Sequence, residues 1–449
     1  MKTKDSKDAA SLRGAQQGPV RTEPFHSSCY VSGQEEALLL ECLRSHQWSS
    51  FKGGTEGLDI DKVLVMPSRE AAEYGPLDNR FLGGKYVRAF ERDFAACMDV
   101  DFAVSANSAT SALIMALGAF NLEPGDEVIV PCMSFNATAT AVLAYNCIPV
   151  FAEVKANTYC LDPADLEKKI SGRTKAVLVV HLGGACADMT SIVEVARRHG
   201  LKILEDCAQA PGVKFQGQPV GTFGDAGVFS LTETKNITCG EGGVLVTRCP
   251  DIAAKARLIR NHGEGVTRDQ WSDGQLANVI GMNFRLTELQ AAVAIPQLQS
   301  LEERNEVRRR NTSYLIDRLR KHPCLIPPET EPGGDYVCFM LKWRYVQGDL
   351  PLTRDEVVAG LQAQGIPIIK GYGRMMHENL IFTRKIAYGR QGFPFIAPWF
   401  DEKRVRYGSG TQPVSEDLNK QFIWFKYVNH PNTQDDMDDV VRAFDKVLV

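Results

Sequence analysis

The stretch EDCAQAPGVKFQGQPVGTFGDAGVFSLTETKNITCGEGG, from Glu205 to Gly243, decides the fold of this chain. An acid, Asp206, ends one short apolar run, and a lysine, Lys235, follows the next run in a glycine-rich turn. An acid and a lysine at strand ends suit pyridoxal phosphate (PLP), because the acid keeps the pyridine nitrogen protonated and the lysine carries the cofactor as a Schiff base. Ser230 is a candidate donor to the cofactor phosphate, and Gln209 a candidate partner for the ring hydroxyl.

Short apolar runs alternate with segments of helical period on both sides of this stretch. Seven of the runs are strand-length and almost continuously apolar, as in a sheet that is buried on both faces. The alternation predicts an α/β domain with a mostly parallel seven-stranded sheet, in which ligand sites lie at the carboxyl ends of the strands. The predicted strands are Phe102–Ser105, Glu127–Val130, Pro149–Ala152, Ala176–Val180, Lys202–Glu205, Ala226–Ser230 and Gly243–Thr247.

The pattern changes after the predicted sheet. A long helix follows Arg285, and Pro296 is expected to kink or split it. Beyond it, a mixture of strands and helices predicts a smaller C-terminal α+β domain. These elements are the strands Val337–Tyr345 and Pro367–Ile369 and the helices Arg354–Gln364 and Gln434–Val447. The predicted organisation is a polar N-terminal tail (1–32), a large domain (33–290), and a linking helix with the small domain (291–449).

The composition is that of an ordinary globular protein, with 44% hydrophobic and 24% charged residues among 449. The net charge of −4 gives no reason to expect nucleic acid or an anionic membrane as a partner. The apolar stretches are too short for a transmembrane helix, and the N-terminus has no signal-peptide pattern, so a cytoplasmic location is predicted. The twelve cysteines are scattered, which predicts free thiols and no metal site.

The Lys235 turn resembles the cofactor-binding motif of the DegT/DnrJ/EryC1/StrS family of PLP-dependent sugar aminotransferases. In that family the lysine of the pattern S-x-x-x-x-K-N-x-T-x-G-E-G-G binds PLP, and here the pattern runs from Ser230 to Gly243. The resemblance extends from Gly83 to the C-terminus. It implies the type I PLP-dependent aminotransferase fold, glutamate or glutamine as amino donor, and a keto-sugar as acceptor, with a nucleotide-linked sugar favoured.

Two further motifs match the family around the cofactor. The segment Ser105–Thr110 joins a predicted strand to a helix, whose exposed backbone N–H groups form an anion site. The resemblance places the PLP phosphate against Ala109 and Thr110, where Ala109 replaces the family's glycine. It also stacks the aromatic ring of Phe135 on the cofactor ring. From its sequence context alone, Phe135 is equally well a core residue.

The resemblance assigns four other residues to the site. His181, at a strand end, faces the cofactor region or is a structural histidine in a supporting role. Asn283 reaches the phosphate in the partner subunit, which implies a homodimer with shared active sites. Arg285 contacts the substrate or positions its own loop. Tyr372 lies in a segment that aligns only loosely with the substrate-facing loop of the family.

Residues 51–81 form a longer segment than in many relatives. It is expected either to help form the sugar pocket or to be a surface excursion that covers a neighbour. Its polar and aromatic candidates for the pocket are Lys52, Arg69, Tyr74, Asn79, Arg80 and Phe81.

Retention of Lys235 favours amino transfer over the alternative of a PLP-dependent sugar dehydrase, in which histidine replaces this lysine. A cyclitol (keto-inositol) aminotransferase is a second alternative. A non-catalytic regulator with the PLP fold is the third, and the complete set of Asp206, Ser230 and Lys235 argues against it. The predicted role is therefore transamination in amino-sugar biosynthesis, for a cell-surface polysaccharide or a secondary metabolite.

Overall fold

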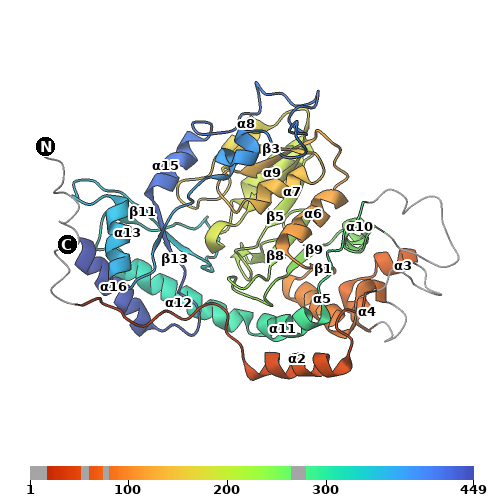
Figure 1. Ribbon diagram of the computed structural model, residues 1–449, viewed down its shortest axis with the longest axis horizontal. Coiled ribbons are helices and arrows are strands. Elements are labelled where there is room, and N and C mark those ends of the chain that lie inside the picture. Colours follow the sequence, from red (N-terminus) through yellow and green to blue (C-terminus); the bar gives the residue numbers. More distant parts are fainter. Residues whose placement is uncertain (1–17, 52–59, 74–79, 264–279, 449) are drawn as a thin grey trace.

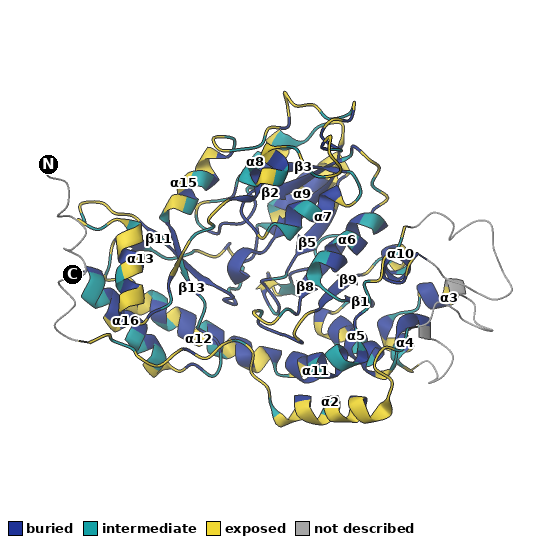
Figure 2. Cartoon of the chain, in the orientation of Figure 1, coloured by how far each residue is buried: buried dark blue, intermediate teal, exposed yellow. Residues whose placement is uncertain are grey.

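The computed structural model describes residues 18–51, 60–73, 80–263 and 280–448, and it divides them between two sheets. Figure 1 shows the larger sheet beside the smaller one, with helices α11 and α12 running along both. Figure 2 shows that the strands of the larger sheet are buried, whereas α2 (Gly33–Ser45) lies on the outside with its outer face exposed. Among the described helices, none is both long and apolar enough to span a membrane.

The larger sheet has seven strands in the order β1-β9-β8-β5-β4-β2-β3. Six of them run in the same direction, while β9 runs antiparallel to both of its neighbours, β1 and β8. All seven predicted strands are confirmed, and their bounds differ by two residues at most. The strands are β1 (Phe102–Ala106), β2 (Glu127–Pro131), β3 (Ile148–Ala152), β4 (Thr174–Val180), β5 (Lys202–Asp206), β8 (Ala226–Ser230) and β9 (Gly243–Thr247).

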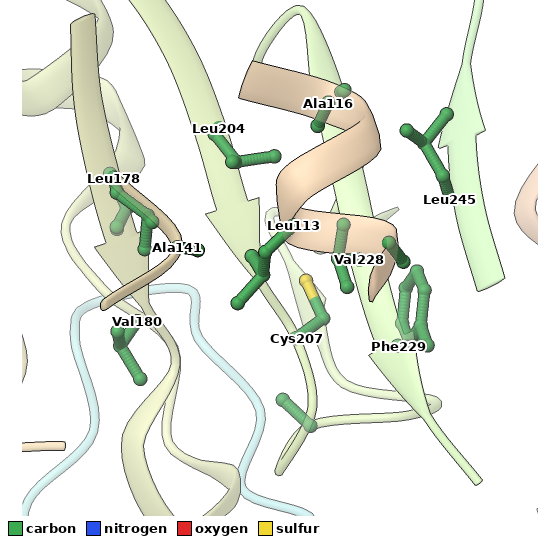
Figure 3. Close-up of a cluster of buried hydrophobic side chains, with 14 of the residues drawn as sticks. Leu113, Ala116, Ala141, Leu178, Val180, Leu204, Cys207, Val228, Phe229 and Leu245 are labelled. Carbon is green, nitrogen blue, oxygen red and sulfur yellow. The ribbon is translucent and has the colours of Figure 1, made fainter. Parts of the chain in front are cut away.

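Helices cover this sheet, which explains why its strands are apolar throughout. Figure 3 shows α6 lying over the middle of the sheet, with Leu113 and Ala116 pointing toward the neighbouring strands. Leu204 of β5 and Val228 of β8 are fully buried there. The covering helices are α5 (Lys85–Met98), α6 (Ala109–Ala119), α7 (Ala137–Leu143), α8 (Pro163–Lys169), α9 (Met189–His199) and α10 (Pro250–Arg260), with the short hairpin β6 (Lys214–Phe215) and β7 (Gln218–Pro219) at one end.

The predicted long helix is split as expected. Helix α11 (Glu288–Gln299) contains Pro296 near its C-terminal end. Helix α12 (Leu301–Leu319) begins after Ser300, one turn beyond that proline. The smaller sheet follows, in the order β10-β11-β13-β12. Its elements are β10 (Leu325–Ile326), β11 (Leu341–Tyr345), β12 (Ile369–Lys370) and β13 (Phe422–Phe425), with helices α13 (Arg354–Ala363) and α16 (Gln434–Leu448) packed against them.

The segment between β12 and β13 leaves the small domain and packs on the large one. It contains α14 (Leu380–Thr383) and α15 (Pro413–Gln421). The ring centroid of Phe382 lies 5.1 Å from that of Phe151 on β3, and both side chains belong to the large core. The structure therefore divides the predicted small domain 291–449 into two parts, separated by an excursion that completes the core of the large domain.

The N-terminal segment from Gly18 onward is docked on the small domain rather than free. Arg21 forms ion pairs with Asp436 and Asp439, each at 2.8 Å. Phe25 is buried, and its ring centroid lies 5.2 Å from that of Phe425 on β13. The predicted polar tail 1–32 is thus a strap over its described part, and residues 1–17 lie outside the described residues.

The described part of segment 51–81 forms a small helical cluster of its own. It contains α3 (Ile60–Leu64), α4 (Ser68–Glu73) and the turn Arg80–Leu82, and it packs against α5 and α10. Phe81 is fully buried in this cluster, so this candidate for the sugar pocket does not present its ring to a substrate. Arg69 is exposed. Lys52, Tyr74 and Asn79 lie outside the described residues, as does the side chain of Arg80.

Glu205 ties β5 to the turn that precedes β8. Its side chain is fully buried, and its carboxylate accepts the N–H groups of Gly221 (2.7 Å), Phe223 (2.7 Å) and Gly224 (2.8 Å). We expect Glu205→Gln to lower the free energy of unfolding by roughly 1–3 kcal/mol, because an amide offers one acceptor oxygen and leaves buried donors unpaired.

Urea denaturation followed by circular dichroism measures this loss. The matched control is Glu36→Gln, at an exposed position on α2, which is expected to change the stability by less than about 0.5 kcal/mol. Equal stabilities of the two variants would contradict the structural role given to Glu205.

Candidate active site

Asp206 lies at the carboxyl end of β5, in the middle of the sheet. Its carboxylate accepts a hydrogen bond from the Thr138 hydroxyl (2.9 Å) and another from the Ala208 N–H (3.1 Å). Burial raises the pKa of Asp206, and these hydrogen bonds and the charge of Lys235 oppose the rise. A cationic group placed against this carboxylate would restore its ordinary acidity, and the protonated ring nitrogen of PLP is such a group.

Lys235 lies in the loop that joins β8 to β9. Its Nζ atom is 4.2 Å from the ring centroid of Phe339, which belongs to the segment preceding β11. Burial lowers the pKa of Lys235 to about 8, with the charge of Asp206 acting in the opposite direction. A sizeable fraction of the amine is therefore neutral near physiological pH, the form in which a lysine acts as a nucleophile or a base.

The glycines after Lys235 bring two parts of the predicted phosphate site together. A Cβ atom on Gly243 would lie 2.5 Å from the backbone nitrogen of Ala109, so only glycine fits where β9 passes the start of α6. Ser230 is paired with Gly243 across the β8–β9 ladder. Ser230, Ala109 and Thr110 thus gather at the N-terminus of α6, where backbone N–H groups attract an anion.

Phe135 is the exposed aromatic residue of this region. It follows β2, directly before the helix whose residue Thr138 bonds Asp206. Its side chain is 69% exposed, so the structure does not support the alternative that it is a core residue. A ring left open beside a buried carboxylate and a half-buried lysine fits the predicted stacking on a flat cofactor.

Gln209 and Tyr372 meet on the other side of Asp206. The Gln209 side-chain oxygen accepts the Gly183 N–H at 2.7 Å, and the Gln209 side chain opposes the rise in the pKa of Tyr372 that burial causes. Burial raises the pKa of Tyr372 to about 12, so its hydroxyl stays protonated. Tyr372 is thereby placed next to the predicted cofactor contacts, although it comes from the excursion that follows β12.

His181 is enclosed by protein. Its Nδ1 atom accepts the Ala187 N–H at 3.1 Å, so the ring proton is on Nε2, which donates to the Glu205 carboxylate at 3.1 Å. Both nitrogens are therefore engaged within the protein, and the side chain is fully buried. This geometry favours the supporting role over a contact with the substrate.

Arg285 and Asn283 lie on the segment before α11. Arg285 donates to the side-chain oxygen of Asn261 at 2.7 Å, which favours the loop-positioning role of its two predicted roles. The Asn283 carbonyl accepts from Asn107, next to the phosphate site, and the Asn283 side chain is exposed. Met282 and Ile280 beside it are exposed apolar residues.

Sequence reasoning did not identify three residues of this site. Thr138, which holds Asp206, lies three residues after Phe135, one helical turn further along the same motif. Glu205 is adjacent to Asp206, but adjacent strand residues point to opposite faces, so it serves the neighbouring loop instead. Phe339 comes from the other domain, and no local pattern connects it to Lys235.

The arrangement fits PLP. An anion site at the start of α6, an exposed aromatic face, a buried acid and a lysine of lowered pKa correspond to the phosphate, ring, ring nitrogen and aldehyde of this cofactor. When bound, PLP supplies an electron-withdrawing ring that stabilises negative charge at a substrate carbon. The fold and the site together define the class, a PLP-dependent aminotransferase of fold type I.

The chain belongs to the DegT/DnrJ/EryC1/StrS aminotransferase family, whose sequence profile matches residues 77–405. This membership confirms the predicted family, the PLP dependence and the assignment as a transaminase. The chain is similar to the L-glutamine:scyllo-inosose aminotransferase of Streptomyces griseus, with 44% identity over 81% of this chain and 86% of that protein. It is 36% identical to the L-glutamine:2-deoxy-scyllo-inosose aminotransferase of Streptoalloteichus tenebrarius, over 96% of both chains.

Two further relatives extend the comparison. The GDP-perosamine synthase of Caulobacter vibrioides is 39% identical over 63% of this chain and 75% of that protein. The crystal structure of DesV from S. venezuelae superposes with a TM-score of 0.72 at 30% identity, covering 92% of this chain and 93% of that chain.

We expect the rate at which the apoprotein takes up PLP covalently to rise with pH and to level off above about 8. Because the pKa of Lys235 is lowered to about 8, the neutral, reactive fraction of the amine falls steadily as the pH is lowered below that value. In Asp206→Asn the midpoint moves to lower pH, because the carboxylate charge raises the pKa of Lys235. Visible absorbance of the covalent complex measures the rate, and Lys235→Ala, which has no amine, is the blank. A midpoint near the ordinary lysine value in the wild type argues against a buried amine.

Proposed function

We propose that this aminotransferase moves the amino group of glutamine onto the ring ketone of a polyhydroxylated six-membered ring. The observation that carries the proposal is the similarity to two L-glutamine-dependent inosose aminotransferases, over 96% and 81% of this chain. The arrangement of Asp206, Lys235 and Phe135 supports it, because these groups suit the PLP chemistry that such a transfer requires.

Within this class of acceptor we favour a keto-inositol, one of the alternatives that the sequence leaves open. The inosose aminotransferases align over 81% and 96% of this chain, whereas the GDP-perosamine synthase aligns over 63%. A nucleotide-linked keto-sugar is the second candidate, and the 39% identity to that synthase supports it. The two acceptors differ in the nucleotide and in the ring, which is all carbon in an inosose and contains an oxygen in a sugar, so they are separable by experiment.

Each proposed residue has a defined task. Lys235 would hold the cofactor covalently and, once freed from it, would act as the general base and acid that moves a proton from the donor's α-carbon. Asp206 holds the ring nitrogen protonated through both half-reactions. Phe135 covers one face of the ring and keeps water away from the reacting carbon. Tyr372, fixed against Gln209, orients the side of the ring that bears the hydroxyl.

We also propose that two copies of the chain share each active site. The support is the placement of Asn283, whose side chain is exposed between apolar neighbours that a second subunit would cover. Asn283 would then contact the cofactor phosphate held by the other copy.

A panel of acceptors tests the assigned substrate class. Enzyme converted to the amino form with glutamine is mixed with scyllo-inosose, 2-deoxy-scyllo-inosose or a nucleotide-linked 4-keto-sugar, and return of the aldehyde-form absorbance is followed. We expect the inososes to react at least about 10-fold more efficiently, which corresponds to about 1.4 kcal/mol in the transition state. Preference for the nucleotide-linked sugar would reverse the choice, and reaction with none of the three would refute the proposed function.

Heterodimers of Lys235→Ala and Asn283→Ala subunits test the shared site. Each homodimer is expected to be impaired. A heterodimer gathers both changes in one site and leaves the other site intact, so about half of the wild-type activity per dimer returns. Differently tagged subunits allow the heterodimer to be isolated. Heterodimers that show only the mean of the two homodimer activities would mean that each chain builds its own site.

A further inference from the structure

Strand β1 lies at one edge of the large sheet, because β9 is its only partner among the described strands. Alternate residues of an edge strand turn their backbone N–H and C=O groups to the open side. In β1 these residues are Ala103 and Ser105, and both are fully buried. The open side of β1 is therefore covered, although none of the described strands covers it.

Side chains from three helices take the place of the missing strand. The Ser68 hydroxyl of α4 accepts the Ala103 N–H at 2.9 Å and donates to the Ala103 carbonyl at 3.1 Å. Further along β1, the Glu91 carboxylate of α5 accepts the Ser105 N–H at 2.9 Å. Arg260 of α10 donates to the Ser105 carbonyl at 3.2 Å. We call Ser68, Glu91 and Arg260 the edge clamp, because they pair the backbone groups that a neighbouring strand would pair.

The edge clamp is buried and internally bonded. Glu91 and Arg260 form an ion pair at 2.5 Å, and neither side chain is more than 2% exposed. The Glu91 oxygen in this ion pair also accepts the Ser105 hydroxyl at 2.7 Å. Such a cluster keeps its geometry, because breaking one of its contacts leaves a buried charge or donor unsatisfied.

Two further buried arginines fasten the helices around the edge clamp. Arg257 of α10 donates to the carbonyls of Val63 (3.2 Å) and Leu64 (2.6 Å) at the end of α3. Arg88 of α5 donates to a carbonyl of α4 at 3.2 Å. The described part of segment 51–81 is thus fixed along β1, which favours its expected role as the cover of a neighbour over a role in the sugar pocket.

The clamped strand leads directly into the predicted phosphate site. The turn of residues 106–110 joins the end of β1 to α6, and it contains Ala109 and Thr110, the predicted phosphate contacts. Backbone N–H groups bind an anion well only when they point at it together, so a shift of this turn weakens all of their contacts at once. We infer that the edge clamp positions this turn for the phosphate of PLP. Its three residues act through β1, so they are positioning residues.

A comparison of PLP with pyridoxal, which lacks the phosphate, tests the inference. The dissociation constants of both ligands for the apoprotein are measured by absorbance titration, and their ratio reports what the phosphate contributes to binding. We expect Glu91→Gln to reduce the preference for PLP at least about 10-fold, which corresponds to about 1.4 kcal/mol. Ser68→Ala is expected to reduce it at least about 3-fold. The dissociation constant of pyridoxal should stay nearly the same, whereas a general loosening of the fold would weaken both ligands.

Ser415→Ala is the matched control for Ser68→Ala, at the opposite edge of the same sheet. The Ser415 hydroxyl is fully buried and accepts the Val154 N–H at 3.0 Å, just beyond the end of β3. Its loss is expected to lower the free energy of unfolding and to leave the preference for PLP unchanged.

An unchanged preference in both Glu91→Gln and Ser68→Ala would overturn the inference, and so would an equal loss of affinity for the two ligands. A wild-type protein that does not prefer PLP to pyridoxal would overturn it as well. If Glu91→Gln does not fold, Ser105→Ala takes its place, because it removes one donor to the same carboxylate.

Discussion

The placement of a buried carboxylate and a half-buried lysine at neighbouring strand ends is the constraint on which the rest of this structure depends. Asp206 ends β5, and Lys235 follows β8, the parallel neighbour of β5 in the sheet. Burial raises the pKa of Asp206 and lowers the pKa of Lys235, so it favours the neutral form of both side chains. The charge of each residue opposes the pKa shift of the other. Such a site is stabilised by a ligand that carries both a cationic ring nitrogen and an aldehyde. The ring nitrogen pairs with the carboxylate of Asp206, and the aldehyde reacts with the amine of Lys235.

The small domain participates in the same site through the backbone. The Gly183 carbonyl accepts from Phe339 (3.0 Å), and the Gly184 carbonyl accepts from Val337 (3.1 Å). Lys342, which is fully buried, donates to the Leu182 carbonyl at 2.6 Å. The loop held in this way presents the Gly183 N–H to Gln209. The junction of the two domains thus helps to position the loop that bonds Gln209 beside Asp206.

The large sheet could be predicted from the sequence because its signal is local. Strands that are covered on both faces must be apolar throughout, and all seven of them read as apolar runs bounded by turns. The positions of Asp206, Ser230 and Lys235 followed, since strand ends are fixed once the strands are. The division of the small domain into two parts of the chain could not be predicted in the same way. The excursion after β12 packs Phe382 against Phe151 of the large domain, and nothing in its own residues distinguishes this contact from packing within the small domain.

The same reasoning explains why the N-terminal strap looks like a tail in the sequence. Its attachment uses few side chains of its own, because Asn429 donates to the carbonyl of Ser27 at 2.9 Å and Asn432 to that of His26 at 3.0 Å. Backbone carbonyls are present in every sequence, so a polar segment held through them has no distinguishing composition. The partners that identify the strap lie about 400 residues away. The strap placed in this way reaches the loop that carries Lys235, where the Ser28 hydroxyl donates to the Glu233 carbonyl at 3.4 Å, and only the folded chain brings these segments together.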